Sequence, residues 1–183
     1  MAIDKTAPPA PQPFTGVGVY LTSEIHSAKC ASGRMSAEKL ISAMASILDY
    51  QMAIIESNGG LIEQFVGDCI VAYWLPADPA MLVRAVRESA ARISREKVTV
   101  DNLEFDLRIT FCVAEIAGAY FGRPPGARFQ IVGKARDRAA RLLAFSPPGD
   151  WLITDVDTVA LMPEPRRAEF TQTGSTSYSL QLS

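Results

Sequence analysis

The sequence is poor in the residues that build the commonest catalytic centres. It has a single histidine, His26, in 183 residues, and its three cysteines form no CxxC pair. One histidine cannot supply a histidine-rich zinc site, and it gives little support to a serine–histidine triad. Cys30, Cys69 and Cys112 lie far apart in the chain, and the last two lie within apolar runs. This pattern is typical of reduced core cysteines in a cytosolic protein.

The chain also lacks a strong charge of either sign and a long hydrophobic run. Its formal net charge is -2, which argues against a nucleic-acid binder with a broad basic face. No apolar segment is long enough to span a bilayer, and Asp4 and Lys5 interrupt any signal-peptide core. We therefore expect a cytoplasmic protein that has no membrane span and binds no nucleic acid. A nucleotide that carries its own magnesium ion remains compatible with this charge.

The remaining composition fits one folded domain. Hydrophobic residues make up 48% of the chain, which is enough for a sizeable core at this length. The first thirteen residues, MAIDKTAPPAPQP, are typical of a proline-rich tail or linker. Residues 14–183 are expected to form the domain.

Hydrophobic periodicity predicts alternating strands and helices. Alternation of apolar and polar residues predicts strands at 14–23, 61–66, 69–74 and 105–116. Gly67-Asp68 separates the middle two strands as a tight hairpin turn. Apolar residues at three- and four-residue steps predict two intervening helices, which begin at Ser36 and at Asp78-Pro79. The expected fold class is therefore α+β, with a ferredoxin-like or polymerase-palm βαββαβ core.

The C-terminal third predicts additions to this core. Residues 118–126 are expected to form a turn and a proline-rich loop, followed by a short strand at 129–132. An alanine- and arginine-rich helix is expected at 134–145. Further strands are expected at 151–153, around Phe170, and at 178–182.

Three segments carry a resemblance to a known family. They are NGGLIEQFVGDCIVAYW, with seven positions from its second glycine to Gly-Asp, FQIVGKARDRAARLLA, and LRITFCVAEIAGAYFG. Together they resemble the hairpin, the strand–Gly–helix segment and the central strand of class III nucleotidyl cyclase catalytic domains, the adenylate and guanylate cyclases. The resemblance covers roughly residues 14–182. It implies the class III cyclase fold and a site shared between two chains.

The resemblance implies a two-metal reaction. The family joins the ribose 3′-oxygen of a nucleoside triphosphate to its own α-phosphorus and releases pyrophosphate, with two metal ions held by two carboxylates. These carboxylates fall on Asp68 and on Glu24, which stands where the family usually has aspartate. Mg²⁺ or Mn²⁺ is therefore the implied cofactor of an active protein. Taken alone, Asp68 is also an ordinary turn residue, and Glu24 is also a solvated acid at a strand end.

The other implied site residues depart from the family pattern. The phosphate-binding arginine falls on Arg141, but the position of the ribose-binding asparagine holds Asp137. The two base-reading positions, commonly Lys and Asp in adenylate cyclases, fall on Gln64 and Gln130. An i,i+4 ion pair explains Asp137 and Arg141 without a nucleotide, and the glutamines also suit a polar dimer surface.

Two functions follow. The first is a catalytically degenerate cyclase-like domain, a nucleotide-binding or protein-interaction module of intracellular signalling that forms a homodimer or a heterodimer with another cyclase-like chain. The second is an active, divergent cyclase that converts a nucleoside triphosphate to a 3′,5′-cyclic monophosphate and pyrophosphate. An unrelated palm-like interaction domain is a third option, against which the FQIVG…RAARL segment speaks. Because positioning and charge stabilisation supply nearly all of the catalysis, the departures favour the first.

Overall fold

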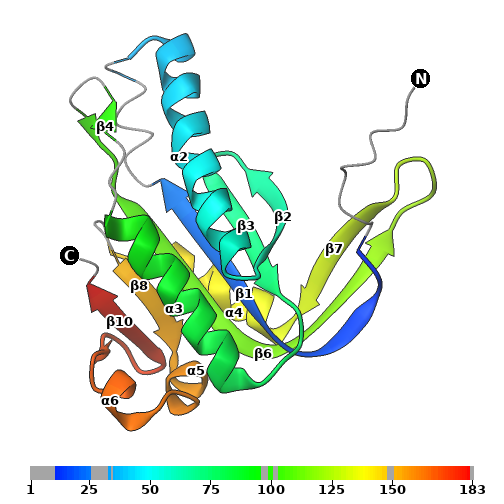
Figure 1. Cartoon of the computed structure of the whole chain (residues 1–183), viewed down its shortest axis with the longest axis vertical. Coiled ribbons are helices and arrows are strands. Elements are labelled where there is room, and N and C mark those ends of the chain that lie inside the picture. The colour runs from blue at the N-terminus through cyan, green and yellow to red at the C-terminus, as the bar shows by residue number, and fades with distance from the viewer. Residues whose placement is uncertain are drawn as a thin grey trace.

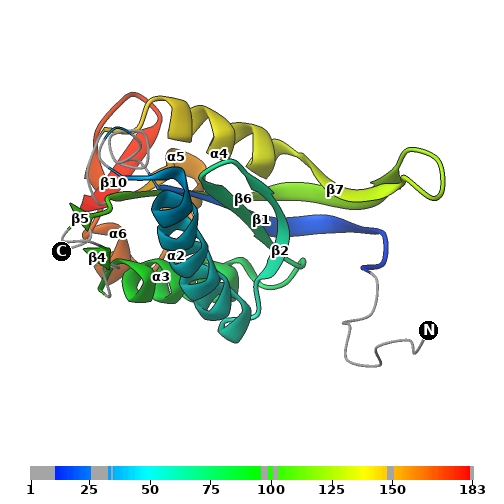
Figure 2. The same cartoon turned by 90° about the horizontal axis from the view of Figure 1, so that it is seen from above.

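The computed structural model describes residues 11–25, 33, 35–95, 99–100, 103–147 and 151–181. Most of the predicted tail, together with His26 and Cys30, therefore lies outside the described residues. The centre of the fold is an eight-stranded sheet in the order β2-β3-β1-β6-β8-β10-β9, with β7 paired to β6. Figures 1 and 2 show helices α2 and α3 on one face of this sheet and α4 on the other.

Strand β1 (Phe14–Ile25) is the axis of the sheet. It pairs antiparallel with β3 (Cys69–Trp74) on one side and with β6 (Leu107–Phe121) on the other. Strand β2 (Leu61–Val66) pairs with β3 through a turn in which Gly67 has a φ of 62°. Because this left-handed conformation suits glycine, the Gly-Asp hairpin is formed as the sequence predicts.

Helices α2 and α3 begin at the caps that the sequence predicts. Helix α2 (Ala37–Ser57) follows Ser36, whose hydroxyl accepts a hydrogen bond from the Lys39 amide at 3.3 Å. Helix α3 (Pro79–Arg95) follows Asp78, whose carboxylate accepts from the amides of the first turn at 3.0 and 3.2 Å. Both helices pack on the face that carries the larger core cluster. In the described residues, no helix is both long and apolar enough to cross a bilayer.

Strand β6 continues further than the sequence predicts. Residues 118–121 were expected to begin a turn, but they extend β6 and pair with β7 (Arg128–Gly133). Gly118 marks a close approach of side chains, since a Cβ there would lie 2.5 Å from the Phe14 ring and 2.6 Å from the Phe129 ring. The resulting β6–β7 hairpin extends beyond the helices (Figure 2).

The C-terminal part completes the sheet and adds elements that the sequence did not indicate. Helix α4 (Lys134–Ala144) leads to β8 (Trp151–Asp155), which runs parallel to β6. The expected final strands are present as β9 (Thr171–Gln172) and β10 (Ser177–Gln181). The additional elements of this part are α5 (Val156–Ala160) and α6 (Glu164–Arg167). Ahead of β6, β4 (Thr99–Val100) and β5 (Leu103–Glu104) form a separate two-stranded sheet.

Two apolar clusters hold the layers together. The larger lies between the sheet and helices α2 and α3 and includes Leu21 and Val86. The smaller lies between the sheet and α4 and includes Tyr20, Cys112 and Ala139. Cys112 is buried as predicted, whereas Cys69 is only half-buried. The α4 side of the sheet therefore has a core of its own.

Replacement of Gly118 by alanine tests the close packing at the base of the β6–β7 hairpin. The added Cβ has to displace two aromatic rings, so we expect Gly118→Ala to lower the free energy of unfolding by about 1–3 kcal/mol. Urea denaturation measures this change. Gly126→Ala in the same hairpin is the control, because its nearest neighbour would lie 3.6 Å away and stability should not change. Equal stability of the two variants would contradict this packing.

Candidate functional site

The two predicted metal carboxylates lie at the same end of the sheet. Glu24 lies near the end of β1, opposite Cys69 on β3 and opposite Arg108 on β6. Asp68 comes directly before Cys69 at the hairpin tip, and its main-chain carbonyl accepts a hydrogen bond from the Ile25 amide at 3.0 Å. The strand register thus brings together two residues that are far apart in the sequence.

The Cys69 thiol lies in the field of both carboxylates. Burial raises the pKa of this thiol to about 12, and the charges of Glu24 and Asp68 act in the same direction. A thiol with such a pKa stays protonated at neutral pH, so it is a poor nucleophile and a poor metal ligand. Cys69 is a structural residue of this sheet end.

Glu24 already has a partner within the chain. The Arg108 guanidinium forms an ion pair with its carboxylate and also donates a hydrogen bond to the Ser146 carbonyl at 3.0 Å. The side chains of Arg108 and Glu24 are only 14% and 16% exposed, so water screens the pair weakly. Arg108 therefore connects the end of β1, the start of β6 and the segment that follows α4.

This pairing determines whether the carboxylates fit a divalent cation. Mg²⁺ and Mn²⁺ bind through carboxylate oxygens, and a two-carboxylate site needs both groups available. In the structure the Glu24 charge is compensated by Arg108, and a guanidinium beside a dication is electrostatically unfavourable. Asp68 alone is left as a half-buried turn carboxylate. In this conformation the residues do not fit a resident divalent ion.

Asp137 and Arg141 lie on the exposed side of α4. The Arg141 Nε donates to the main-chain carbonyl of Asp137 at 3.2 Å, and no ion pair joins the two side chains in the described part of the chain. The i,i+4 ion pair considered for these residues is therefore absent. The Arg141 guanidinium has no carboxylate partner among the described residues.

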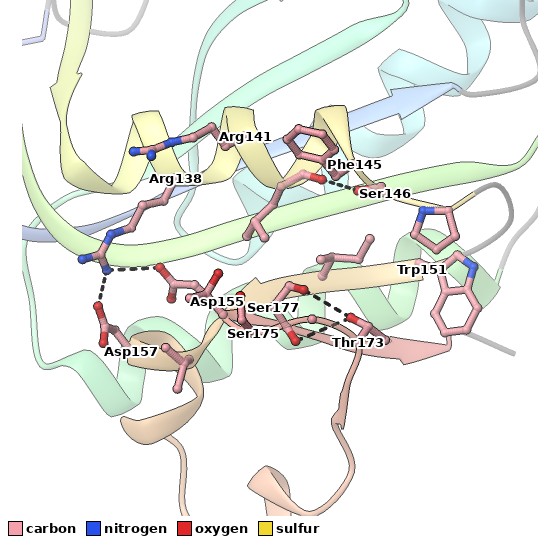
Figure 3. Close-up of a pocket in the computed structure, with 16 residues that line it drawn as sticks. Arg138, Arg141, Phe145, Ser146, Trp151, Asp155, Asp157, Thr173, Ser175 and Ser177 are labelled. Atoms are coloured by element: carbon pink, nitrogen blue, oxygen red, sulfur yellow. Dashed lines mark hydrogen bonds and ion pairs between the residues drawn. The ribbon is translucent and has the colours of Figure 1, made fainter.

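A pocket of about 910 Å³ opens between α4 and the β8–β10 side of the sheet (Figure 3). Arg141, Phe145 and Trp151 line it, together with the hydroxyl-rich loop at residues 173–177. Arg138, also in the lining, forms ion pairs with Asp155 at 3.1 Å and with Asp157 at 2.6 Å. The charge of Arg138 is therefore compensated, while that of Arg141 is available to a ligand.

The two predicted base-reading residues lie on β2 and β7, which are joined by a hydrogen bond from the Ile131 amide to the Glu63 carboxylate. Gln64 on β2 lies opposite Val71, which belongs to the core cluster beneath α4. Gln130 on β7 alternates with Phe129 and Ile131, which pack in that cluster, so Gln130 lies on the other face of its strand. The structure joins their two strands but does not place both glutamines on one face. Base reading by this pair stays a prediction.

The sequence pattern missed several charged groups of this region, Arg108 among them. Glu63 accepts hydrogen bonds from Tyr20 and from the Ile131 amide, and Asp155 pairs with Arg138 across the segment between α4 and β8. Both sets of contacts join positions that are distant in the sequence or lie on separate elements. No local spacing signals them.

The comparisons with known proteins identify the fold. No protein-family model matches the chain, and no curated protein is significantly similar to it in sequence. Among solved structures, the adenylyl cyclase CyaB from P. aeruginosa matches with a TM-score of 0.75, 16% identity and coverage of 94% of this chain and 97% of that chain. The guanylate cyclase domain of RhGC from Catenaria anguillulae, solved with GTP, matches with a TM-score of 0.72, 15% identity and coverage of 94% and 99%.

A third solved structure extends the similarity to a dimeric domain. The guanylyl cyclase domain of the RhoGC fusion protein from Blastocladiella emersonii, described as a non-canonical dimer, matches with a TM-score of 0.74, 14% identity and coverage of 93% and 98%. At these identities the similarity shows the fold. The chain has the α+β fold of class III adenylyl and guanylyl cyclase catalytic domains, which confirms the expected fold class.

Because Arg108 compensates the negative charge of Glu24, removal of the arginine is expected to strengthen metal binding. We expect the Arg108→Met variant to bind Mn²⁺ about tenfold more tightly than the original chain, because the Glu24 charge is then free for the cation. The electron paramagnetic resonance signal of free Mn²⁺ measures this binding. The double variant Arg108→Met/Glu24→Gln should lose the gain.

Arg87→Met is the matched control, because it removes an arginine from an ion pair with Glu169, away from this sheet end. It should leave Mn²⁺ binding unchanged. Tight Mn²⁺ binding by the original chain that Glu24→Gln abolishes would contradict the account of this site.

Proposed function

We propose that the chain is a nucleotidyl cyclase-like domain without cyclase turnover, which serves cytoplasmic signalling as a nucleotide-binding or protein-interaction module. The observation that carries this proposal is the shielded ion pair between Arg108 and Glu24. Two-metal catalysis needs carboxylates that hold cations beside the reacting phosphate. A carboxylate that is neutralised from within the chain does not perform that role.

The charges near α4 support the same proposal. Asp137 stands where the family resemblance places an asparagine, so it adds a negative charge where a triphosphate would need a neutral donor. Gln64 and Gln130 stand where the family resemblance places Lys and Asp in adenylate cyclases, so two charged base-reading groups are missing. The loss of several positioning groups from one site reduces turnover strongly, because their contributions act together.

Retained nucleotide binding is supported by the pocket beside α4. Its volume of about 910 Å³ lies within the range of small-molecule sites. Arg141 offers a planar cation for a phosphate, the hydroxyls of residues 173–177 offer donors and acceptors, and Phe145 and Trp151 offer aromatic surface. This combination suits a molecule with both an anionic and an aromatic part, such as a nucleoside triphosphate.

The alternative function is an active, divergent cyclase that forms a 3′,5′-cyclic monophosphate and pyrophosphate with Mg²⁺ or Mn²⁺. The register that brings Glu24 and Asp68 to one sheet end favours it. In that case Arg108 has to release Glu24 when a nucleotide and metal bind.

Incubation of the protein with each of the four ribonucleoside triphosphates and Mg²⁺ or Mn²⁺ tests the proposal. We expect no cyclic monophosphate by mass spectrometry, and a rise in melting temperature with at least one nucleotide. Arg141→Ala should weaken that binding by about tenfold or more, because a charge-assisted hydrogen bond is lost. Arg84→Ala, on the exposed side of α3, is the control and should leave it unchanged.

The outcomes separate the candidate functions. A cyclic product that disappears in Asp68→Ala would contradict the proposal and establish the active alternative. Neither product nor a shift in melting temperature would leave only protein interaction.

We also propose that the domain forms a homodimer or pairs with another cyclase-like chain. Large apolar side chains are exposed on the β6–β7 hairpin and on the neighbouring edge strand β2, namely Tyr120, Phe121, Val132, Phe65 and Val66. Exposed apolar side chains on these two elements support a surface that another chain covers. The RhoGC domain is described as dimeric in one solved structure and as monomeric in another, so a domain of this fold associates in pairs in some forms.

Analytical ultracentrifugation tests self-association. We expect a dimer, which Phe121→Glu dissociates because the charge would have to be buried in the interface. Ile41→Glu, at an exposed apolar position of α2, is the control and should leave the dimer intact. A monomer at every protein concentration would contradict the homodimer.

A further inference from the structure

Strand β2 contains an irregularity at Glu63. The register steps from the pair Ile62–Ala72 directly to the pair Gln64–Val71, so β2 has one residue more than β3 at this point. Such a bulge changes the direction of the side chains that follow it. Ile62 packs against the core cluster of α2 and α3, whereas Glu63 bonds to Tyr20 of the cluster beneath α4. Strand alternation places Glu63 on the α4 side, opposite to Ile62, and the bulge places Gln64 on that side too, because Gln64 pairs with Val71.

The Glu63 carboxylate joins two strands that share no ladder. One oxygen accepts from the Tyr20 hydroxyl at 2.9 Å, and the other accepts from the Ile131 main-chain amide of β7 at 2.7 Å. In the described sheet β7 pairs with β6, and no ladder connects it to β2. A single side chain thus makes the hydrogen bond that a neighbouring strand would otherwise provide.

A second charged side chain completes this contact. The Arg136 Nη1, from the first turn of α4, donates to the Ile131 carbonyl at 2.9 Å. Both main-chain groups of Ile131 are therefore held by side chains, one from β2 and one from α4. Burial raises the pKa of Tyr20 well above its usual value, and the Glu63 charge adds to this, so the hydroxyl stays protonated as a donor to Glu63.

The hydrogen bond between Glu63 and Ile131 lies between the two units that carry the predicted site residues. Glu63 lies on the strand that leads to the hairpin tip with Asp68. Ile131 lies three residues before Lys134, where α4 begins, and α4 carries Asp137 and Arg141. The Glu63–Ile131 bond connects the hairpin unit with the strand–helix unit of the candidate site.

We propose that Glu63 is a positioning residue for the nucleotide site. Through β7 and the start of α4, it holds Arg141 in its position beside the pocket. This proposal rests on the proposed nucleotide binding. Glu63 does not touch the pocket of Arg141, and its effect runs through the backbone of Ile131 and the first turn of α4. A hydrogen-bond acceptor at residue 63 is consequently required for affinity, in addition to any effect on stability.

Two variants of Glu63 test the proposal. Glu63→Gln keeps a carbonyl that accepts from the Ile131 amide, and Glu63→Leu has a similar size but no acceptor. In Glu63→Leu we expect hydrogen exchange of the Ile131 amide to become about tenfold faster, and the affinity for the best-bound nucleoside triphosphate to fall about tenfold. Glu63→Gln should restore both to near the original values. NMR measures the exchange, and calorimetry measures the affinity.

Val86→Ala separates positioning from stability. Val86 is fully buried on the face of the sheet opposite α4, so its truncation lowers the melting temperature without reaching this contact. It should leave nucleotide affinity unchanged. Unchanged Ile131 exchange in Glu63→Leu would overturn the proposal, and so would an unchanged affinity in that variant.

The positioning of α4 by Glu63 can be tested even if the protein binds no nucleotide. If the original chain binds no nucleotide, the exchange of the second-turn amides of α4, which donate to the carbonyls of the first turn, decides the matter. Faster exchange there in Glu63→Leu supports positioning of α4 by Glu63. A change confined to Ile131 overturns it.

Discussion

Along β1, Phe14 to Ile25 pair with β6 in continuous antiparallel register, and the last of these pairs place Glu24 opposite Arg108. A shift of β1 by one residue would turn the Glu24 side chain to the other face of the sheet, away from Arg108, and break their ion pair. The same strand pairs with β3, which brings the hairpin tip and Asp68 to the same end. The candidate site therefore depends on β1 pairing correctly on both sides.

Several acidic groups around α4 are held by contacts from within the chain. Glu24 is held by Arg108, Asp155 and Asp157 are held by Arg138, and Glu63 accepts two hydrogen bonds. These contacts connect strands and helices, so the carboxylates stabilise the fold around the pocket. Arg141 remains without a carboxylate partner among the described residues, which is the charge distribution of a site that binds an anion more readily than a cation.

Local sequence signals predicted the elements that are determined by neighbouring residues. The hairpin at Gly67 and the cap at Ser36 follow from turn and capping chemistry, and both occur as predicted. The turn predicted at Gly118 was wrong, because the sequence does not distinguish a glycine in a turn from a glycine packed against two aromatic rings. The ion pair of Glu24 and Arg108 spans 84 residues and depends on register, so no local pattern could predict it.

Arg108, and not a divalent cation, compensates the negative charge of Glu24. A crystal structure of the protein grown with Mn²⁺ and a non-hydrolysable nucleoside triphosphate analogue tests this most directly, because manganese is located by its anomalous scattering. We predict that Glu24 remains bonded to Arg108 and that no anomalous peak lies between Glu24 and Asp68. A manganese peak bound by both carboxylates, with Arg108 displaced, would contradict the account.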